Sequence, residues 1–171
     1  LASLGFFEAL NYGFTSPEVL KKAHSEAELG GLVEVANPVT SDYSVMKPSL
    51  LTGLLVNVRQ NFAHNQKDLR LFEMRRIYSR VGGDGDAKTH TGVKEEIQLA
   101  LLMTGAEVDE FWQGKPTGVD FYSVKGALES VFEMLGTGGV QFQPGGCASY
   151  FHPGQSATLM IAGKAQGALG R

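Results

Sequence analysis

Asn37-Pro-Val-Thr-Ser-Asp-Tyr-Ser-Val-Met-Lys-Pro-Ser-Leu-Leu-Thr-Gly-Leu-Leu55 is the stretch of the sequence that decides the fold. Asn37-Pro38 predicts a turn, and a polar loop follows it. Pro48 suits the first turn of a helix, because the backbone N–H that proline lacks would have no helical partner there. A turn, a loop and a helix start therefore follow one another within one short stretch.

The helix that starts at Pro48 is expected to run to His64 and to be amphipathic. Its apolar side chains fall within an arc of about 140° at about 100° per residue. They are Leu50, Leu51, Leu54, Leu55, Val58 and Phe62. Gly53 costs the helix about 1 kcal/mol relative to alanine, and such a glycine often permits close packing against another element. The leucines are expected to face a core or a partner.

The rest of the chain predicts strands, hairpins and a second long helix. Strands are expected at residues 8–14, 32–35, 69–80, 95–103, 140–143, 158–161 and 165–169, a short helix after Ser16-Pro17, and a glycine-rich loop at 81–92. The second helix is expected between an N-cap at Asp120 and a left-handed stop at Gly136. Gly163-Lys164 is expected to be the turn of the last hairpin. This order predicts an α+β fold, with a mainly antiparallel β-sheet flanked by helices and no internal linker across residues 1–171.

Two of the expected strands have an informative parity. Leu10, Tyr12 and Phe14 alternate with small or polar residues, which is a strand signal. In residues 69–80, both parities carry apolar and charged side chains. This second strand is therefore not a simple core strand.

Composition bounds the classes of function. The chain has 171 residues, of which 43% are apolar and 19% charged, a balance typical of a globular domain large enough to bury a core. A net charge of −3 argues against a surface devoted to nucleic acid, although a local basic patch is allowed. The single cysteine, Cys147, excludes an internal disulfide and fits a reducing compartment.

No apolar run approaches the roughly 18 residues of a membrane span, and the first residues lack the features of a signal peptide. A cytoplasmic protein without a membrane partner is expected. Leu1 is not a natural initiator, and the last residues resemble the middle of a sheet. The chain is therefore expected to be a fragment of a longer protein.

The signals for chemistry are weak. The histidines are single and lack metal-ligand spacing; they are His24, His64, His90 and His152. Gly83-Asp84-Gly85 lacks the Gly-Lys-Ser/Thr of a phosphate loop and predicts a hairpin tip. Cys147 has no evident histidine partner and is expected to be inert. No catalytic, cofactor-binding or metal-ligating residue is therefore assigned.

A basic cluster occupies the strand expected at residues 69–80. Arg70, Arg75, Arg76 and Arg80 follow Lys67, and only Asp68 and Glu73 lie among them as counter-charges. They are candidate contacts to RNA. The alternative is a solvated strand edge or an ion-pair network, which the absence of a clearly interleaved aromatic platform favours.

Five separated segments resemble one family in one order, the β subunit of bacterial phenylalanine–tRNA ligase. The first quoted stretch resembles its Asn-Pro…Asp…Met-Arg-Pro-Ser-Leu-Leu-Pro-Gly-Leu-Leu segment. Residues 71–78 resemble its Leu-Phe-Glu-Ile-Gly-Arg-Val-Phe strand, 120–126 its Asp-Phe-Tyr-Asp-Leu-Lys-Gly helix start, and 151–157 its Phe-His-Pro-Gly-Arg-Ser-Ala turn. Residues 4–14 resemble its entry to the region of class II motif 1. Lys47, Thr52, Arg75 and Gln155 depart from the usual Arg, Pro, Gly and Arg.

The resemblance implies a class II synthetase core-like module without activity of its own. In this family the α subunit carries the active site that uses ATP and Mg²⁺ to attach phenylalanine to tRNA(Phe), within an α2β2 heterotetramer. The module would pair with α and support that assembly, and the fragment alone would be inactive. The chain also shows no glycine-rich segment followed by the Glu-Arg pair of class II motif 3.

Candidate contacts to the α subunit are apolar residues at the entry segment and on the helix from Pro48. They are Phe6, Phe7, Tyr12, Leu50, Leu54 and Val58. Two other classes of function stay open. One is an RNA-binding module built on the arginine cluster, and the other is an independent synthetase-like enzyme that binds ATP.

Overall fold

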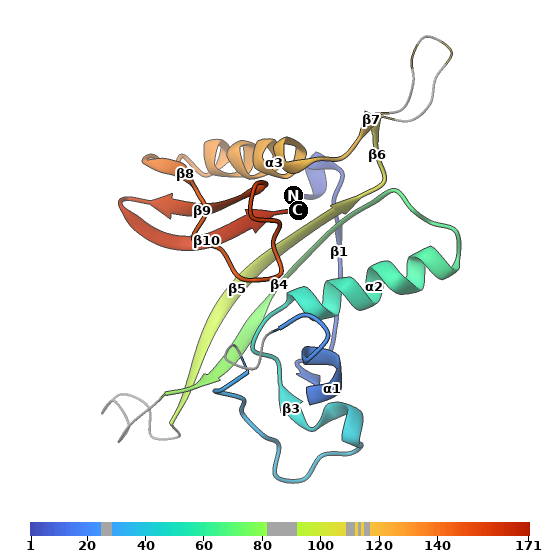
Figure 1. The fold of residues 1–171 in the computed structure, drawn as a ribbon, viewed down its shortest axis with the longest axis vertical. Helices are drawn as coiled ribbons and strands as arrows, with labels where there is room; N and C mark the ends of the chain where they lie inside the picture. The colour runs from blue at the N-terminus through green and yellow to red at the C-terminus, as the bar shows by residue number, and fades with distance from the viewer. Residues whose placement is uncertain (25–28, 82–91, 109–111, 113, 115–116) are drawn as a thin grey trace. The chain divides into compact units, whose positions relative to one another are not determined.

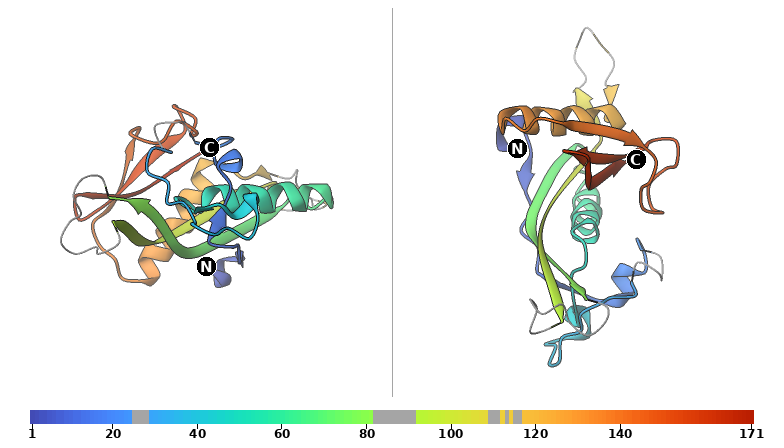
Figure 2. Two further views of the ribbon diagram at one scale, coloured as in Figure 1. Left: turned by 90° about the horizontal axis from the view of Figure 1, so that it is seen from below. Right: turned by 90° about the vertical axis from the view of Figure 1, so that its left-hand side faces the viewer.

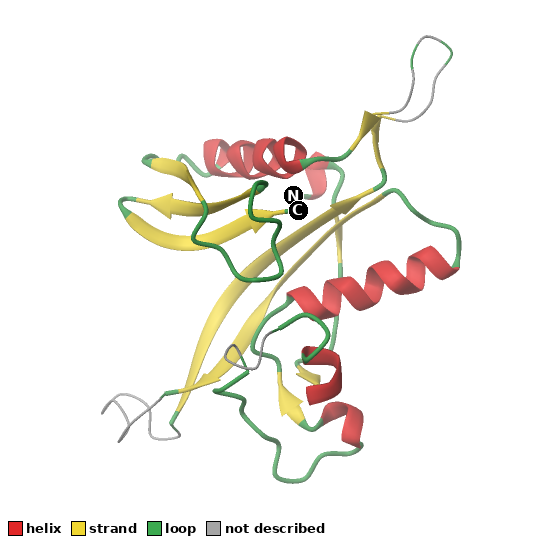
Figure 3. Cartoon of the chain, viewed as in Figure 1, coloured by secondary structure: helices red, strands yellow, loops and turns green. Residues whose placement is uncertain are grey.

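The computed structural model describes residues 1–24, 29–81, 92–108, 112, 114 and 117–171. Short helices and strands in the first part of the chain are η1 (Ala2–Leu4), β1 (Phe7–Glu8), β2 (Phe14–Thr15), α1 (Pro17–Leu20), η2 (Ser41–Tyr43) and β3 (Val45–Met46). The longer elements and their neighbours are α2 (Leu51–Ala63), β4 (Leu69–Arg80), β5 (Val93–Thr104), β6 (Ala106–Val108), β7 (Thr117–Gly118), α3 (Phe121–Met134), β8 (Val140–Pro144), β9 (Ser156–Ile161) and β10 (Lys164–Gly170). Figure 1 shows these elements in chain order, and Figure 3 shows which segments are helices and which are strands.

Contacts within the chain form two compact units, and each is described separately. The first unit comprises residues 1–7, 65–70 and 102–171, and the second comprises residues 8–64 and 71–101. The division falls inside β4 and β5, which belong to a sheet with the strand order β1-β4-β5. The expected α+β class with antiparallel sheets and flanking helices is confirmed, whereas a single undivided domain stays a prediction.

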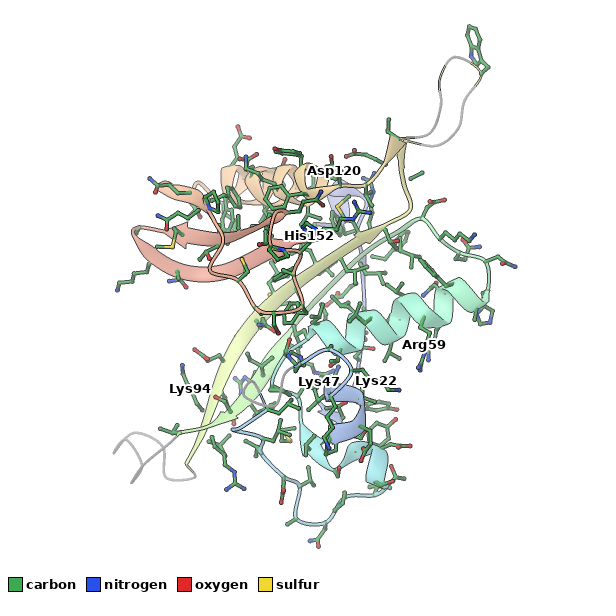
Figure 4. All side chains as sticks on the ribbon, viewed as in Figure 1. Lys22, Lys47, Arg59, Lys94, Asp120 and His152 are labelled. Atoms are coloured by element: carbon green, nitrogen blue, oxygen red, sulfur yellow. The ribbon has the colours of Figure 1, made fainter. Side chains whose placement is uncertain are left out.

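The first unit contains an antiparallel sheet with the strand order β10-β9-β8. Helix α3 lies against it, as the two views of Figure 2 show, and Ala157, Leu159 and Leu169 are buried in this unit. Asp120 caps α3 as expected, since its Oδ1 accepts hydrogen bonds from the N–H groups of Tyr122 and Ser123 at 2.7 and 3.0 Å. The label in Figure 4 marks this capping residue.

The C-terminal end of α3 and the last hairpin each contain a turn that the sequence predicted. Gly136 follows the helix with a φ of 66°, which confirms the left-handed stop. The turn expected at Gly163-Lys164 is wrong by one residue, because Lys164 pairs with Ile161 inside the ladder. The turn residues are Ala162 and Gly163, with φ values of 50° and 76°. Two positive φ values match the twist of a two-residue hairpin.

In the second unit, α2 lies on the sheet that contains β4 and β5 (Figure 1). The helix begins at Leu51, three residues after Pro48, and ends at Ala63. Side chains explain this start: Ser49 Oγ accepts from Leu51 N–H at 3.2 Å, and Gln98 Oε1 accepts from Leu50 N–H at 3.0 Å. Donors at the helix start thus find acceptors before the regular ladder begins.

Two expected strands are shorter in the structure. In residues 8–14, only the ends pair, as β1 and β2, and residues 9–13 form no ladder of their own. In residues 32–35, a single bridge joins Glu34 to Val45. The sequence predicted strands at both places, but a local pattern does not say how many residues of a strand pair with another segment. The Gly83-Asp84-Gly85 tip and His90 lie outside the described residues, as does most of the loop expected at 81–92.

None of the helices in the described part of the chain is long and apolar enough to cross a membrane.

Candidate functional site

The apolar side chains of residues 10–14 point into solvent. Leu10 is 87% exposed, Tyr12 70% and Phe14 41%, whereas Thr15 is buried and Asn11 and Gly13 are half-buried. The alternation predicted from the sequence is present, but its apolar side faces outward. Because soluble proteins seldom place several large apolar side chains together on the surface, this segment is a candidate binding surface.

Tyr43, at the end of η2, extends the same surface. Its ring centroid lies 5.4 Å from that of Tyr12, with the two planes tilted by 60°. Such tilted pairs are favourable for aromatic rings. Phe14 is held by the β2–β3 pairing, in which it lies opposite Met46. We call Leu10, Tyr12, Phe14 and Tyr43 the apolar ridge.

Helix α2 divides its apolar arc between core and surface. Leu50 and Leu54 are fully buried in the second unit, whereas Leu55 and Phe62 are exposed and Val58 is half-buried. Among the other interface candidates, Phe6 is buried, whereas Phe7 and Tyr12 are exposed. A partner can therefore contact Phe7, Tyr12 and Val58 directly, while Phe6, Leu50 and Leu54 offer it almost no surface.

A second exposed apolar surface lies on the sheet of the second unit. Met74 of β4 and Ile97 and Leu99 of β5 are exposed. Arg76 lies on the same side of β4 as Met74, and Glu95 lies on the same side of β5 as Ile97 and Leu99. Arg76 and Glu95 form an ion pair at 3.2 Å. Surfaces on which apolar residues lie beside an ion pair are also found in contact with solvent.

Beneath the apolar ridge lies a polar cluster that consists of Asn11, Lys47, Asn57 and Glu73. Asn11 Nδ2 donates to Glu73 Oε2 at 2.8 Å and lies 2.9 Å from Asn57 Oδ1. Lys47 Nζ lies 3.9 Å from Glu73 Oε1, and the two residues are 4% and 2% exposed. Neither Lys47 Nζ nor Glu73 Oε1 has a hydrogen-bond partner among the described residues. Figure 4 labels Lys47 within this unit.

Burial lowers the pKa of the Lys47 ammonium below its ordinary value of 10.5; Glu73 opposes this shift and Arg75 adds to it. Asn11 and Asn57, the other members of the cluster, carry no charge. Below the folded-state pKa, Lys47 is protonated both in the folded and in the unfolded chain. Between the folded-state pKa and 10.5, only the unfolded chain keeps the proton, so folding releases it and stability rises with pH.

The expected result is that the stability of the chain relative to a Lys47→Met variant shifts in favour of the original chain as pH rises toward 10.5. Denaturant unfolding of both proteins at several pH values measures this difference. The comparison cancels titration of groups that the two proteins share. A difference that does not change with pH would show that Lys47 keeps its ordinary pKa.

Because Gly53 of α2 has no side chain, the ammonium group of Lys47 can lie close to the helix at this position. A Cβ built at Gly53 would lie 2.5 Å from Lys47 Nζ, 3.1 Å from Asn11 Nδ2 and 3.3 Å from Glu73 Oε2. The glycine that sequence periodicity marked as a close-packing position therefore packs against the polar cluster.

We expect Gly53→Ala to destabilise the protein by about 2 kcal/mol, because displacement of a buried ammonium exceeds the gain of about 1 kcal/mol in helix propensity. Gly126→Ala is the matched control, since Gly126 is also helical and a Cβ there meets nothing within 4 Å. This control is expected to stabilise the protein. Urea unfolding of the two variants gives both values, and equal stabilisation by both would contradict the packing argument.

The arginine candidates do not form one free cationic surface. Arg70 Nη2 donates to Glu107 O at 2.9 Å in the first unit, and Arg80 Nε donates to Leu32 O at 3.1 Å in the second. Arg76 pairs with Glu95. Arg75 points to the opposite face of β4 from Arg76, because side chains alternate along a strand. An RNA contact at these residues stays a prediction.

The remaining candidates for chemistry have local roles. His152 Nδ1 accepts from Gly154 N–H at 3.2 Å, which organises the Pro153-Gly154 turn, and Cys147 Sγ lies 3.4 Å from Gly145 O. The Phe151 ring lies against Gly170, where a Cβ would come within 2.6 Å of it. Among the described residues, no group of three or more His, Cys, Asp or Glu could hold a metal ion.

Sequence reasoning missed the direction of residues 10–14 and the burial of Lys47 with Glu73. Asn11, placed between Leu10 and Tyr12, was an available signal, because a polar residue on the inner side of an extended segment needs a buried partner. Glu73, inside a strand of mixed parity, was the matching signal.

The whole length of the chain is similar to known proteins of one family. A family model described as "Phenylalanyl tRNA synthetase beta chain CLM domain" matches residues 1–171. Similar proteins include phenylalanine–tRNA ligase β subunits of Geobacter sulfurreducens (34% identical over 168 residues, 97% of this chain and 20% of the relative) and Yersinia pestis (36% over 171 residues, 99% and 20%). The chain thus spans about a fifth of the length of these relatives.

Solved structures support the fold. Two structures of pyrrolysyl-tRNA synthetase from Desulfitobacterium hafniense are similar, with TM-scores of 0.57 and 0.60. They share 14% and 12% sequence identity, over 94% and 96% of this chain and 48% and 52% of theirs. At this identity, the likeness concerns the fold alone.

Proposed function

The chain belongs to the family of the phenylalanyl-tRNA synthetase β chain CLM domain, and on that premise we propose that it is a non-catalytic module that binds the catalytic α subunit and supports its assembly. In this proposal the complete enzyme attaches phenylalanine to tRNA(Phe) with ATP, as an α2β2 heterotetramer in the cytoplasm. This chain contributes surface rather than reacting groups.

The apolar ridge is the observation that carries the proposal. Leu10 and Tyr12 are the most exposed residues of the ridge, and they occur in the segment that resembles the class II motif 1 region. Removal of such side chains from water on association contributes about 25 cal/mol per Å² before the costs of ordering. A partner that covers the ridge would therefore gain free energy that the isolated chain cannot.

ATP and Mg²⁺ belong, in this proposal, to the α subunit. The carboxylates described here do not gather into a cation site, and the buried Glu73 is already engaged by Asn11 and Lys47. The residues present thus do not fit the metal, and we assign no step of the aminoacylation reaction to them.

Co-production of the α subunit with the full-length β subunit, with and without residues 1–171, tests the proposal. We expect α to co-purify with the complete β subunit and to aminoacylate tRNA(Phe), and both properties to be lost without these residues. Undiminished assembly and aminoacylation without them would refute the proposal.

A further inference from the structure

The segment that carries Leu10 and Tyr12 is held at every second residue. Ala9 N–H donates to Phe72 O at 2.7 Å, and the side chain of Asn11 bonds Glu73 and Asn57. Gly13 O accepts from Lys47 N–H at 3.0 Å. The backbone bonds at Ala9 and Gly13 fix the position of the segment. Because side chains alternate along extended backbone, the inward side chain of Asn11 leaves those of Leu10 and Tyr12 on the other side.

Burial of apolar surface is favourable, so the hydrophobic effect alone would turn Leu10 and Tyr12 inward. Another interaction must therefore favour their outward direction. Asn11 would then turn outward and leave Glu73 Oε2 without its donor. A hydrogen bond to a buried carboxylate is strong, and a buried carboxylate without a donor is unfavourable, so Asn11 favours the outward arrangement of its neighbours.

The polar cluster couples this anchor to the rest of the second unit. Glu73 is 2% exposed, and the counter-charge beside it is Lys47, whose backbone also binds Gly13. Lys47 O in turn accepts from Tyr78 N–H at 2.9 Å. Lys47 therefore contacts three parts of this unit: Gly13 at the end of the segment, the Glu73 carboxylate that binds Asn11, and Tyr78 of strand β4.

We infer that Asn11, through Glu73 and Asn57, is a positioning residue that presents Leu10 and Tyr12 to the partner before it binds. This inference rests on the proposed function of the apolar ridge. Pre-organised side chains spare the complex the cost of ordering them on association. Loss of the Asn11 anchor should therefore weaken binding of the partner, although the residues that contact the partner, Leu10 and Tyr12, are not replaced.

The test is a titration of the α subunit into full-length β subunit that carries Asn11→Ala, with aminoacylation of tRNA(Phe) as the readout. We expect the half-saturating concentration of α to rise about tenfold, because one anchored interaction is lost. The rate at saturating α should equal that of the original enzyme, since the assembled active site is unchanged. Hydrogen exchange of residues 10–13 in the free β subunit should become faster.

Two further variants make the result decisive. Asn57→Ala removes one of the two partners of Asn11 and should raise the half-saturating concentration in the same direction by a smaller factor; it decides the matter if Asn11→Ala does not fold. Asn61→Ala is the matched control, because Asn61 lies on the same helix and its Nδ2 donates to a backbone carbonyl, that of Asn57, at 2.9 Å, rather than to a side chain of the polar cluster. It should leave the titration unchanged.

Folded Asn11→Ala and Asn57→Ala proteins with the original titration curve and the original exchange rates would overturn the inference. The proposed function would then stand or fall separately, on variants of Leu10 and Tyr12 themselves. Failure of those variants to weaken the complex would overturn both.

Discussion

Replacement of Leu10 and Tyr12 together by aspartate should abolish the complex with the α subunit and leave the fold of the chain intact. The two side chains are 87% and 70% exposed, so the folded chain loses little packing. In a complex that covers the apolar ridge, both carboxylates would be taken out of water without partners. Each such burial costs about 2 kcal/mol or more, which together lowers affinity at least about thousandfold.

Size-exclusion chromatography of co-produced subunits measures this loss, and circular dichroism of the β subunit checks that it folds. Val39→Asp is the matched control, since Val39 is also apolar, exposed and in the second unit, but outside the ridge. The control should assemble normally. Normal assembly of the Leu10→Asp, Tyr12→Asp protein would place the interface elsewhere, for example on the surface around Met74 and Ile97.

Glu73→Gln should destabilise the chain by about 3 kcal/mol, because it leaves the Lys47 ammonium buried without its counter-charge. The amide oxygen of glutamine still accepts from Asn11, so the variant removes the charge and keeps the hydrogen bond. Denaturant unfolding at neutral pH measures the change in the free energy of unfolding.

The double variant Lys47→Met, Glu73→Gln is the test of that explanation. It removes both charges and keeps a side chain of similar length at residue 47, so it should recover most of the stability that Glu73→Gln loses. Additive losses from the two single variants would contradict a coupled ion pair.

Local signals predicted much of the fold. The Asp120 cap and the Gly136 stop depend on neighbours close in sequence, and both are present in the structure. Helix α2 begins at Leu51 rather than at the predicted Pro48. Gln98, far along the chain, accepts a hydrogen bond from the N–H of Leu50 just before that start. The shortened strand at residues 8–14 likewise depends on distant partners, since Ala9 bonds Phe72 and Phe14 lies opposite Met46.

The site was predictable in kind and less so in detail. Alternation identified Leu10, Tyr12 and Phe14 as one face, but periodicity does not say whether that face turns toward the core or toward solvent. That direction depends on the bond between Asn11 and Glu73, two residues that lie 62 positions apart. The same limit applies to α2, whose apolar arc proved to be part core, at Leu54, and part surface, at Leu55.

Hydrogen exchange of the full-length β subunit, free and bound to the α subunit, tests the central claim most directly. The amides of residues 9–14 should exchange more slowly in the complex, because the partner covers the apolar ridge. The strand Lys164–Gly170, in the other unit and outside the proposed surface, serves as the internal reference. Unchanged exchange at residues 9–14 in a fully assembled complex would contradict the account.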